Sequence, residues 1–563
     1  MDRKHQTRIG LAMSRKPSAI DELSNAWVVK LAELSPSFST YVGIPGGEDR
    51  LDDNSPAAAE NYYNLQKELL AKLEGMEPQD KIDEVSKAAL AANLDLGIRL
   101  HESGLWKRDV AVIASPAQNI RDIFDLTPVA TVADWENVAK RMRAVEGAVE
   151  GYIETLRLGI AENNTPAIRQ VNWVVNDLNN ITGENGFFAN FAKADGKDLP
   201  DSLRSELGAA SAVATAAYAK LQNFLRDELA PAATAGDAIG RERYALLSEQ
   251  FVGKAMDLEE TLQWGIEELA RVKAEQEAVA NEILPGATVL EAIAHLDNDP
   301  SRKLHSTDEL QKWMQRLSDE AIEKLGATHF DIPEKLRTLE CMIAPTNSGV
   351  IYYTGPTDDF SRPGRMWWSV PAGVTEFDTW RETTTVYHEG VPGHHLQIAT
   401  QVYNREELNN WRRMANWCSG HGEGWALYAE RLMQDLGFLN DPGDRLGMLA
   451  GQRMRAARVV LDISVHLDKP RLDGTGKWDF DYAVEFFSQN CNMSPEFINF
   501  EVHRYFGWPG QAPSYKIGQR VWEQIRDEAK AKAGADWDIK KFHRDALNLG
   551  ALRLDILRDA VIG

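Results

Sequence analysis

Hydrophobic positions along the chain recur mainly at the three- and four-residue steps of amphipathic helices. In the segment 256–283, Leu258, Leu262, Ile266 and Leu269 follow this spacing. Proline, glycine and asparagine separate such segments, as is typical of connections between helices. The pattern predicts further long helices at Ala57–Leu73, Lys81–Leu105, Val132–Ala161 and Leu203–Leu229.

The pattern changes near Cys341. Three short segments rich in aromatic or β-branched residues, CMIAP, VIYYTGP and RMWWSVP, are bounded by proline and glycine and predict two or three strands. Helical spacing resumes at Glu376 and predicts long helices at Glu423–Leu436, Asp444–Leu467 and Ile517–Ala533. We therefore expect a mostly α fold with one small β-sheet. An N-terminal helical region, 1–340, would pack closely against a catalytic region, 341–563.

Charge narrows the classes of function. The 563 residues include 62 basic and 85 acidic side chains, a net charge of −23. Such a surface repels nucleic acid and anionic lipid, so we expect neither as a partner. A chain of this length buries enough apolar surface to fold without a structural metal, so any metal would serve chemistry.

The cysteines and the N-terminus bear on location. Cys341, Cys418 and Cys491 are too few and too widely spaced for a disulfide framework, which fits a reducing compartment. The first residues lack the apolar run of a secretory signal, and no apolar stretch is long enough to cross a bilayer. The expected location is the cytoplasm.

The densest polar cluster follows the predicted strands, in the string YHEGVPGHHLQ with His388, Glu389, His394 and His395. In the zincin motif HExxH, two histidines four residues apart share one helix face and bind zinc, and the glutamate activates a water. Here the next histidines follow His388 by six and seven residues. On a straight helix these spacings give about 120° of rotation or about 10.5 Å of separation, so neither pair could share a cation.

A local break in the helix can restore the geometry. Pro392 has no N–H to donate to the carbonyl of His388, and Gly390 and Gly393 tolerate unusual dihedral angles. We expect one helix to end near Glu389 and a second to open at Pro392, after a tight turn. That turn would bring His394 back toward His388. The choice between His394 and His395 stays open.

The third ligand should be a carboxylate from the segment SGHGEGWALYAERL. Glu423 opens the helix predicted there, 29 residues after His394. Three protein ligands would leave one position free, as a catalytic metal site needs. His421 and Glu430 are alternatives, and Glu430 could instead support a ligand from behind. The competing interpretation is a polar structural core with no metal.

The strings YHEGVPGHHLQ, GEGWALYAERL and RYFGWPGQAPSYKIGQ resemble the bacterial family called domain of unknown function 885, and the resemblance covers most of the chain. That family is similar to glutamate-ligated helical zinc metallopeptidases of the thimet-oligopeptidase kind. The resemblance implies a large helical metallopeptidase-like fold and one Zn²⁺ per chain. It places the ligands at His388, His394 and Glu423 and the base at Glu389, with an insertion of two residues relative to HExGH.

Polar and aromatic residues in other segments are further candidates. His503 and Tyr515 resemble a His and Tyr pair that stabilises the oxyanion in such enzymes, although the WPG segment between them could simply form a turn. Tyr505 and Lys516 could reach substrate, and Arg362 could meet a substrate carboxylate or form a structural ion pair. The strand at RMWWSV is the candidate edge against which a peptide would pair.

The leading hypothesis is a zinc-dependent peptidase that hydrolyses short peptides through a metal-activated water. One alternative is a metal-dependent amidase acting on a non-peptide amide. The other is a non-catalytic helical binding protein. The expected partner is a peptide substrate, with neither nucleic acid nor membrane.

Overall fold

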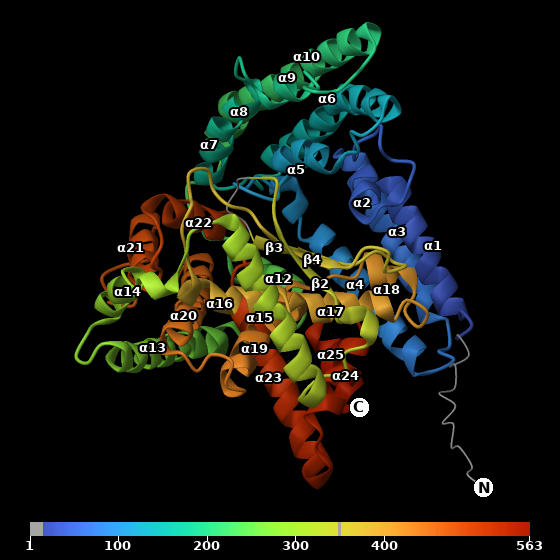
Figure 1. The fold of residues 1–563 in the computed structure, drawn as a ribbon. Coiled ribbons are helices and arrows are strands. Elements are labelled where there is room, and N and C mark those ends of the chain that lie inside the picture. The colour runs from blue at the N-terminus through green and yellow to red at the C-terminus, as the bar shows by residue number, and fades with distance from the viewer. Residues whose placement is uncertain (1–14, 347–350) are drawn as a thin grey trace.

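The computed structural model describes residues 15–346 and 351–563, and helices form most of it (Figure 1). The predicted mostly α fold is confirmed, and its strands form two small sheets rather than the one expected. Four helices open the chain, and each begins after a serine or aspartate whose side chain accepts a backbone N–H of the first turn. They are α1 (Ala19–Leu34), α2 (Pro36–Val42), α3 (Pro56–Glu74) and α4 (Lys81–Glu102).

The next segment builds its own hydrophobic core around two long helices, α6 and α10. They lie side by side at the top of Figure 1. The helix predicted at Val132–Ala161 is α6 to the residue, whereas Leu203–Leu229 is α10 followed by a π-helical turn, η3. The elements are η1 (Leu105–Arg108), α5 (Pro116–Asp122), η2 (Ile123–Leu126), α6 (Val132–Ala161), α7 (Ile168–Asp177), α8 (Asn179–Thr182), α9 (Phe187–Phe191), α10 (Asp201–Phe224), η3 (Leu225–Leu229) and α11 (Ala230–Ala232).

The largest core lies beneath these elements and draws side chains from most of the chain, from Ile20 to Leu557. Helix α13, predicted from its apolar spacing, packs lengthwise against α20. The division at residue 340 stays a prediction. The helices before the main sheet are α12 (Arg241–Val252), α13 (Leu258–Ile283), α14 (Val289–Asp297), η4 (Pro300–Arg302), α15 (Thr307–Thr328) and η5 (Glu334–Leu336).

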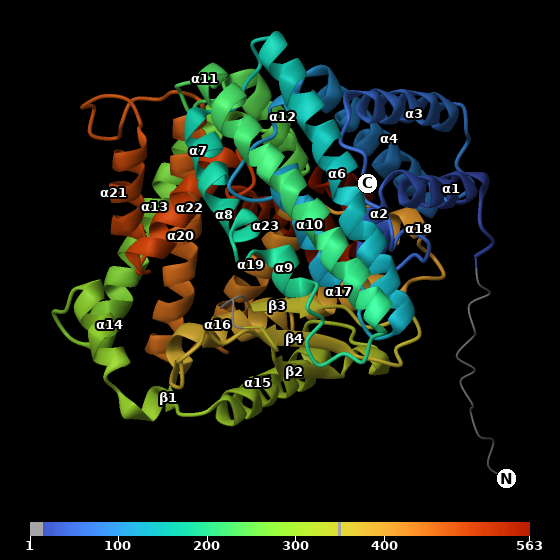
Figure 2. The same cartoon turned by 90° about the horizontal axis from the view of Figure 1, so that it is seen from above.

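The remaining helices carry most of the polar motifs, and a third, smaller core joins α20, α21 and α22. Figure 2 shows α20 beside α13, with α15 running below the sheet. These helices are α16 (Thr379–Glu389), α17 (His394–Tyr403), α18 (Asn410–Met414), α19 (Ser419–Asp435), α20 (Pro442–His466), α21 (Phe480–Asn490), α22 (Pro495–Gly507), α23 (Ser514–Ala533), η6 (Gly534–Asp536), α24 (Ile539–Asn548) and α25 (Leu554–Ile562).

The three predicted strand segments form one sheet in the order β2-β4-β3. Strand β4 (Gly364–Trp368) is parallel to β2 (Leu339–Ile343) and antiparallel to β3 (Ile351–Thr354), and Val350 of the predicted segment lies outside the described residues. The expectation that RMWWSV is an edge strand is wrong, because β4 is paired on both sides. A second pair, β1 (Lys303–Leu304) with β5 (Phe377–Asp378), has no sequence signal at two residues per strand.

Helices α19 and α23 touch backbone to backbone. A Cβ at Gly424 would lie 2.4 Å from the carbonyl carbon of Gly518, and a Cβ at Gly518 would lie 2.2 Å from the carbonyl oxygen of Gly420. Only glycine fits such a contact. In the described part of the chain, no helix combines the length and apolar character required to span a bilayer.

Two glycine-to-alanine substitutions should change stability in opposite directions, because only one of the two glycines lies in this contact. Gly518→Ala should lower the free energy of unfolding by about 1–3 kcal/mol, because α23 must move away from α19. Gly208→Ala, in α10 with nothing within 4 Å of the added methyl group, should raise it by about 0.5–1 kcal/mol. Chemical denaturation measures both, and equal stability of the two variants would contradict the close contact.

Candidate metal centre

The cluster begins with the turn between α16 and α17. Helix α16 ends at Glu389 as expected, but α17 begins at His394, two residues later than predicted. Gly390 and Gly393 have ψ values of −125° and −131°, outside the helical region, so the four-residue segment GVPG is not helical. Its Val391–Pro392 bond is cis. The turn places the imidazole rings of His388 and His394 4.9 Å apart, nearly perpendicular to each other.

Contacts on both sides fix this turn. A Cβ at Gly393 would lie 1.9 Å from the carbonyl oxygen of His388, so the chain passes too close for any side chain there. The N–H of Gly393 donates to the carbonyl of Tyr387 at 3.1 Å. From α19, the indole of Trp425 donates to the carbonyl of Pro392 at 2.9 Å. The turn is therefore positioned by the same helix that carries Glu423.

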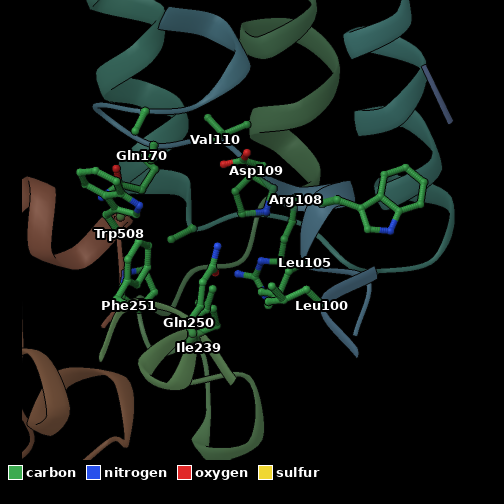
Figure 3. Close-up of a pocket in the computed structure, with 18 of the residues that line it drawn as sticks. Leu100, Leu105, Arg108, Asp109, Val110, Gln170, Ile239, Gln250, Phe251 and Trp508 are labelled. Carbon is green, nitrogen blue, oxygen red and sulfur yellow. The ribbon is translucent and has the colours of Figure 1, made fainter. Parts of the chain in front are cut away.

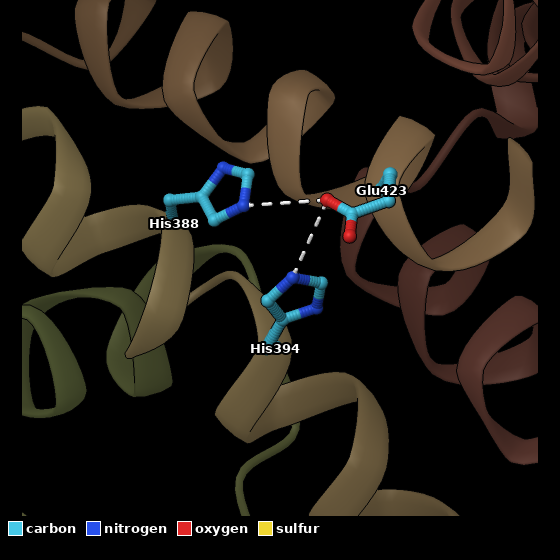
Figure 4. Close-up of side chains that lie close together, drawn as sticks. All are labelled: His388, His394 and Glu423. Carbon is cyan, nitrogen blue, oxygen red and sulfur yellow. Dashed lines mark ion pairs between the residues drawn. The ribbon is translucent and has the colours of Figure 1, made fainter. Parts of the chain in front are cut away.

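Three side chains converge at this point, as Figure 4 shows. One carboxylate oxygen of Glu423 lies 3.5 Å from Nε2 of His388 and 3.7 Å from Nε2 of His394. One ligand atom from each of the three residues lies within 4.8 Å of the others. Both histidines are buried, with 6% and 8% of their surface exposed. The structure thus brings together the three residues predicted as ligands.

The donor set fits a divalent cation. Ligand atoms about 2.0–2.1 Å from a tetrahedral zinc ion are separated by roughly 3.3–3.4 Å, close to the two distances at Glu423. Two imidazoles with one carboxylate are the ligands of many catalytic zinc sites. The structure supports a metal site at these residues and does not identify the metal.

Residues behind His388 orient its ring. Nδ1 of His388 pairs with Glu430 at 2.8 Å, which leaves Nε2 directed at Glu423. The other oxygen of Glu430 accepts a hydrogen bond from Thr384 at 2.9 Å, and Arg455 lies 3.7 Å away. A carboxylate behind a metal-bound histidine fixes its tautomer and orientation. Glu430 therefore lies behind His388, where it can support this ligand, as the sequence analysis allowed. Nδ1 of His394 has no hydrogen-bond partner among the described residues.

Charge within the cluster is strongly coupled. Burial alone would lower the pKa of His388, but its contacts with Glu423 and Glu430 raise this pKa to about 10. Burial would raise the pKa of Glu423, and the two histidines hold it far below its usual range instead. In the metal-free protein, His388 is therefore cationic at neutral pH beside an ionised Glu423.

Glu389, the predicted base, lies beside this cluster. Burial is the main cause that raises the pKa of its carboxyl, while His394 and His388 act in the opposite direction. The side chain is 7% exposed and has neither a hydrogen bond nor an ion pair among the described residues. A buried carboxylate without a partner is costly for stability alone and is typical of a functional group.

Tyr515, the predicted oxyanion donor, begins α23 and faces the same region. The charge of Glu423 is the main cause that raises the pKa of its phenol to about 12, with burial second. The guanidinium of Arg458 lies 5.5 Å from its ring centre. Its hydroxyl has no hydrogen-bond partner within the described ranges. Tyr515 is therefore a protonated and available donor at neutral pH.

The structure does not bring the alternative histidines to the cluster. His395 uses both ring nitrogens elsewhere, with the carbonyl of Leu336 at 2.8 Å and the hydroxyl of Tyr353 at 3.0 Å. Burial lowers its pKa to about 4. His421 packs edge-on against Trp522, and burial lowers its pKa to about 3. Both positions suit neutral, structural histidines.

His503 and Tyr505 also lie apart from the cluster. The ring of His503 packs 4.4 Å from Trp173, and its Nδ1 bonds to a carbonyl of its own helix. Tyr505 is fully buried, donates its hydroxyl hydrogen to Glu501 and accepts a hydrogen bond from Arg458 at 2.7 Å. These side chains of α22 therefore contact α7 and α20 rather than the predicted metal ligands.

Lys516 and Arg362 have structural partners. Lys516 is 2% exposed and pairs with Glu268 at 2.8 Å and Gln519 at 3.0 Å, so it is held between α13 and α23. Arg362 donates to the carbonyls of Gly355 and Pro363 and closes its own loop. Neither side chain joins the predicted metal ligands.

Two supporting residues escaped the sequence reasoning. Thr384 precedes His388 by four residues on the same face of α16, a spacing that could have indicated it. Arg455 lies on α20, more than sixty residues after His388, and no local pattern connects the two. Its charge acts on Glu389, Glu430 and Tyr515.

Comparison with known proteins gives a family and a fold. A family described as bacterial protein of unknown function (DUF885) matches residues 36–561. The structure of a candidate lipoprotein from Colwellia psychrerythraea matches with a TM-score of 0.83 and 22% identity, over 96% of this chain and 98% of that chain. A candidate lipoprotein of unknown function from Shewanella oneidensis matches with a TM-score of 0.76 and 18% identity, over 97% and 100%.

A carboxypeptidase from Pyrococcus furiosus matches with a TM-score of 0.43 and 13% identity, over 98% of this chain and 96% of that chain. This score is too low to establish a shared fold. No curated protein matches the chain.

The cytoplasmic location expected from the sequence is contradicted. The two solved structures from Colwellia psychrerythraea and Shewanella oneidensis, which share its fold, are named as candidate lipoproteins. The three cysteines are free and buried. A chain of this size can fold without disulfides in either compartment, so its cysteine count does not indicate location.

Substitution of a ligand should remove the metal. Glu423→Ala or His394→Ala should lower the metal bound per chain at least tenfold, because two ligands hold a cation far less tightly than three. Elemental analysis after gentle purification measures this content. His503→Ala, the same loss of an imidazole outside the cluster, should leave it unchanged. Full occupancy in the Glu423 and His394 variants would exclude the site.

Metal binding should release protons. At pH 7 His388 is protonated, because its pKa is raised to about 10, and only the neutral ring can bind a cation. Each ion bound should therefore displace at least one proton, and apparent affinity should rise about tenfold per pH unit below that pKa. Calorimetry of zinc binding to the apo-protein in two buffers of different ionisation enthalpy gives the number of protons released per ion. A value of zero would contradict a protonated His388 in the apo-protein.

Proposed function

The chain belongs to the bacterial family of unknown function DUF885, as its three motifs predict. From the cluster of His388, His394 and Glu423 we propose that it is a zinc-dependent peptidase that hydrolyses short peptides. The observation that carries the proposal is the convergence of His388, His394 and Glu423 beside an unpartnered Glu389. A polar structural core would pair that carboxyl, whereas hydrolysis requires a free base at this place.

The metal would be held by Nε2 of each histidine and by the carboxylate of Glu423. A bound Zn²⁺ supplies a Lewis acid that polarises a carbonyl group and lowers the pKa of water. Glu430 keeps His388 in the required tautomer, with Nδ1 occupied and Nε2 free for the metal. The pairing of Glu430 with Thr384 holds that carboxylate in place.

Glu389 acts as the general base. Its carboxylate receives a proton from the attacking water and later delivers it to the leaving amine. Because burial raises its pKa, the carboxylate accepts a proton more readily than an exposed glutamate does. Its place next to His388 in sequence, on the last turn of α16, fixes it at the edge of the metal cluster.

Tyr515 supplies the donor for the tetrahedral intermediate. Its raised pKa keeps the phenol protonated, and its hydroxyl is not engaged elsewhere in the described part of the structure. A donor aimed at developing negative charge is worth roughly 3–4 kcal/mol of transition-state stabilisation. Since Tyr515 and Glu423 stand on α23 and α19, which touch through glycines, donor and ligand are held by one rigid pair of helices.

An edge strand supports a peptide rather than another amide. Strand β3 has only β4 as a partner among the described strands, and it contacts both α16 and α17. Its free edge offers main-chain N–H and C=O groups that an extended peptide would match regardless of sequence. A small amide lacks this repeating backbone. This edge replaces β4 as the candidate for substrate pairing.

Substitution of the base tests the proposal. Glu389→Gln should reduce turnover of a peptide library by about 10²–10⁴-fold while the metal content stays constant, because only proton transfer is lost. Glu382→Gln, the same change on the same helix about two turns before Glu389, should retain activity. Loss of metal in the Glu389 variant would identify that residue as a ligand instead.

Wild-type substrate profiling separates the alternatives. Cleavage of peptides in the library supports a peptidase. Cleavage of small amides alone would favour a non-peptide amidase. Protein that lacks stoichiometric metal and hydrolyses neither class of compound would favour a binding protein.

A further inference from the structure

A cavity lies away from the metal cluster. It has a volume of about 490 Å³, and none of His388, His394 and Glu423 lines it. Its walls come from α4, η1, α12 and the segment between α22 and α23. Figure 3 shows Trp508 and Phe251 on one side and Leu100 and Leu105 on the other. Its size is within the range of small-molecule sites, about 300–1,000 Å³.

The walls are mainly apolar and aromatic. The indole of Trp508 meets Phe251 edge-on, with ring centres 5.8 Å apart. Leu100, Leu105 and Ile239 add aliphatic surface. Such a lining favours an apolar ligand body, because burying that body removes both surfaces from water.

Two polar side chains without protein partners border this apolar space, the half-buried Arg108 and the exposed Gln250. The guanidinium of Arg108, from η1, and the amide of Gln250, from α12, point toward each other in Figure 3. Neither side chain makes a hydrogen bond or an ion pair within the described residues. In a chain with 85 acidic residues, an arginine in a cavity without a carboxylate partner is unexpected.

The electrostatic surroundings of Arg108 leave its charge uncompensated. Burial is the main cause that lowers its pKa to about 10, and the neighbouring Arg243 lowers it further. Arg108 nevertheless stays cationic at pH 7. Asp109 also lines the cavity, but its side chain is exposed and no ion pair joins it to Arg108. The field at the guanidinium therefore favours an anion.

We propose that this cavity binds a small amphiphilic carboxylate, such as a medium-chain fatty acid, with its head group on Arg108 and Gln250. A guanidinium presents parallel N–H groups that match a carboxylate in a bidentate contact. The amide N–H₂ of Gln250 provides a further donor from the opposite wall. The hydrocarbon chain then packs along Leu100, Leu105, Phe251 and Trp508.

Calorimetry on the full-length, metal-loaded protein tests the proposal with three ligands of equal chain length. Octanoate should bind at one site per chain. 1-Octanol, which lacks the charge, should bind at least tenfold more weakly, and octylamine, which is cationic, should not bind. Equal affinity for octanoate and 1-octanol would overturn the proposal, as would the absence of octanoate binding.

Variants locate the site. Arg108→Gln should weaken octanoate binding by about tenfold to hundredfold, the range expected for a lost charge-assisted hydrogen bond. Arg143→Gln removes the same charge from an exposed position of α6 and should have no effect. Leu105→Trp should fill the cavity and abolish binding while leaving Arg108 in place. Octanoate binding unchanged in either cavity variant would show that the ligand binds elsewhere.

The three-ligand comparison on the wild-type protein decides the head-group preference even if a cavity variant does not fold, and thermal unfolding identifies such a variant. Hydrolysis of peptides does not enter any of these measurements. The proposal therefore stands or falls separately from the proposed peptidase activity.

Discussion

The attraction between one buried carboxylate and two buried imidazoles organises this half of the molecule. Glu423 stays ionised in a desolvated place because His388 and His394 face it, and the cationic form of His388 is stabilised in turn by Glu423. The three side chains come from three helices, so their convergence fixes how α16, α17 and α19 are placed. Glu430 and Thr384 then fix the rotation of the first imidazole.

Sequence reasoning predicted that the two candidate histidine ligands lie together because the constraint between them is local. Pro392 removes a helix hydrogen bond and two glycines flank it, so a break between His388 and His394 could be predicted before the fold was known. Helix α17 starts two residues later than the sequence predicts, and the indole of Trp425, 33 residues after Pro392, holds the carbonyl of that proline in the preceding turn. No local pattern contains that contact.

The same distinction applies to the fold. The apolar spacing over Val132–Ala161 predicts both ends of α6 correctly, because the residues that bury one face of the helix run along its whole length. Strand order depends on pairing between distant segments, and so the central position of β4 was missed. Tyr505 and Lys516 were expected near substrate from composition alone. Their burial against Arg458 and Glu268 depends on how α20 and α13 pack.

The glycine contact between α19 and α23 has a consequence for how this centre can change over evolutionary time. Gly424 and Gly518 leave no room for adjustment between the helices. A substitution that shifts either backbone displaces Glu423 and Tyr515 together. Divergence of specificity is therefore expected to accumulate on the sheet edge and the surrounding loops, while the helical pair is inherited as a unit.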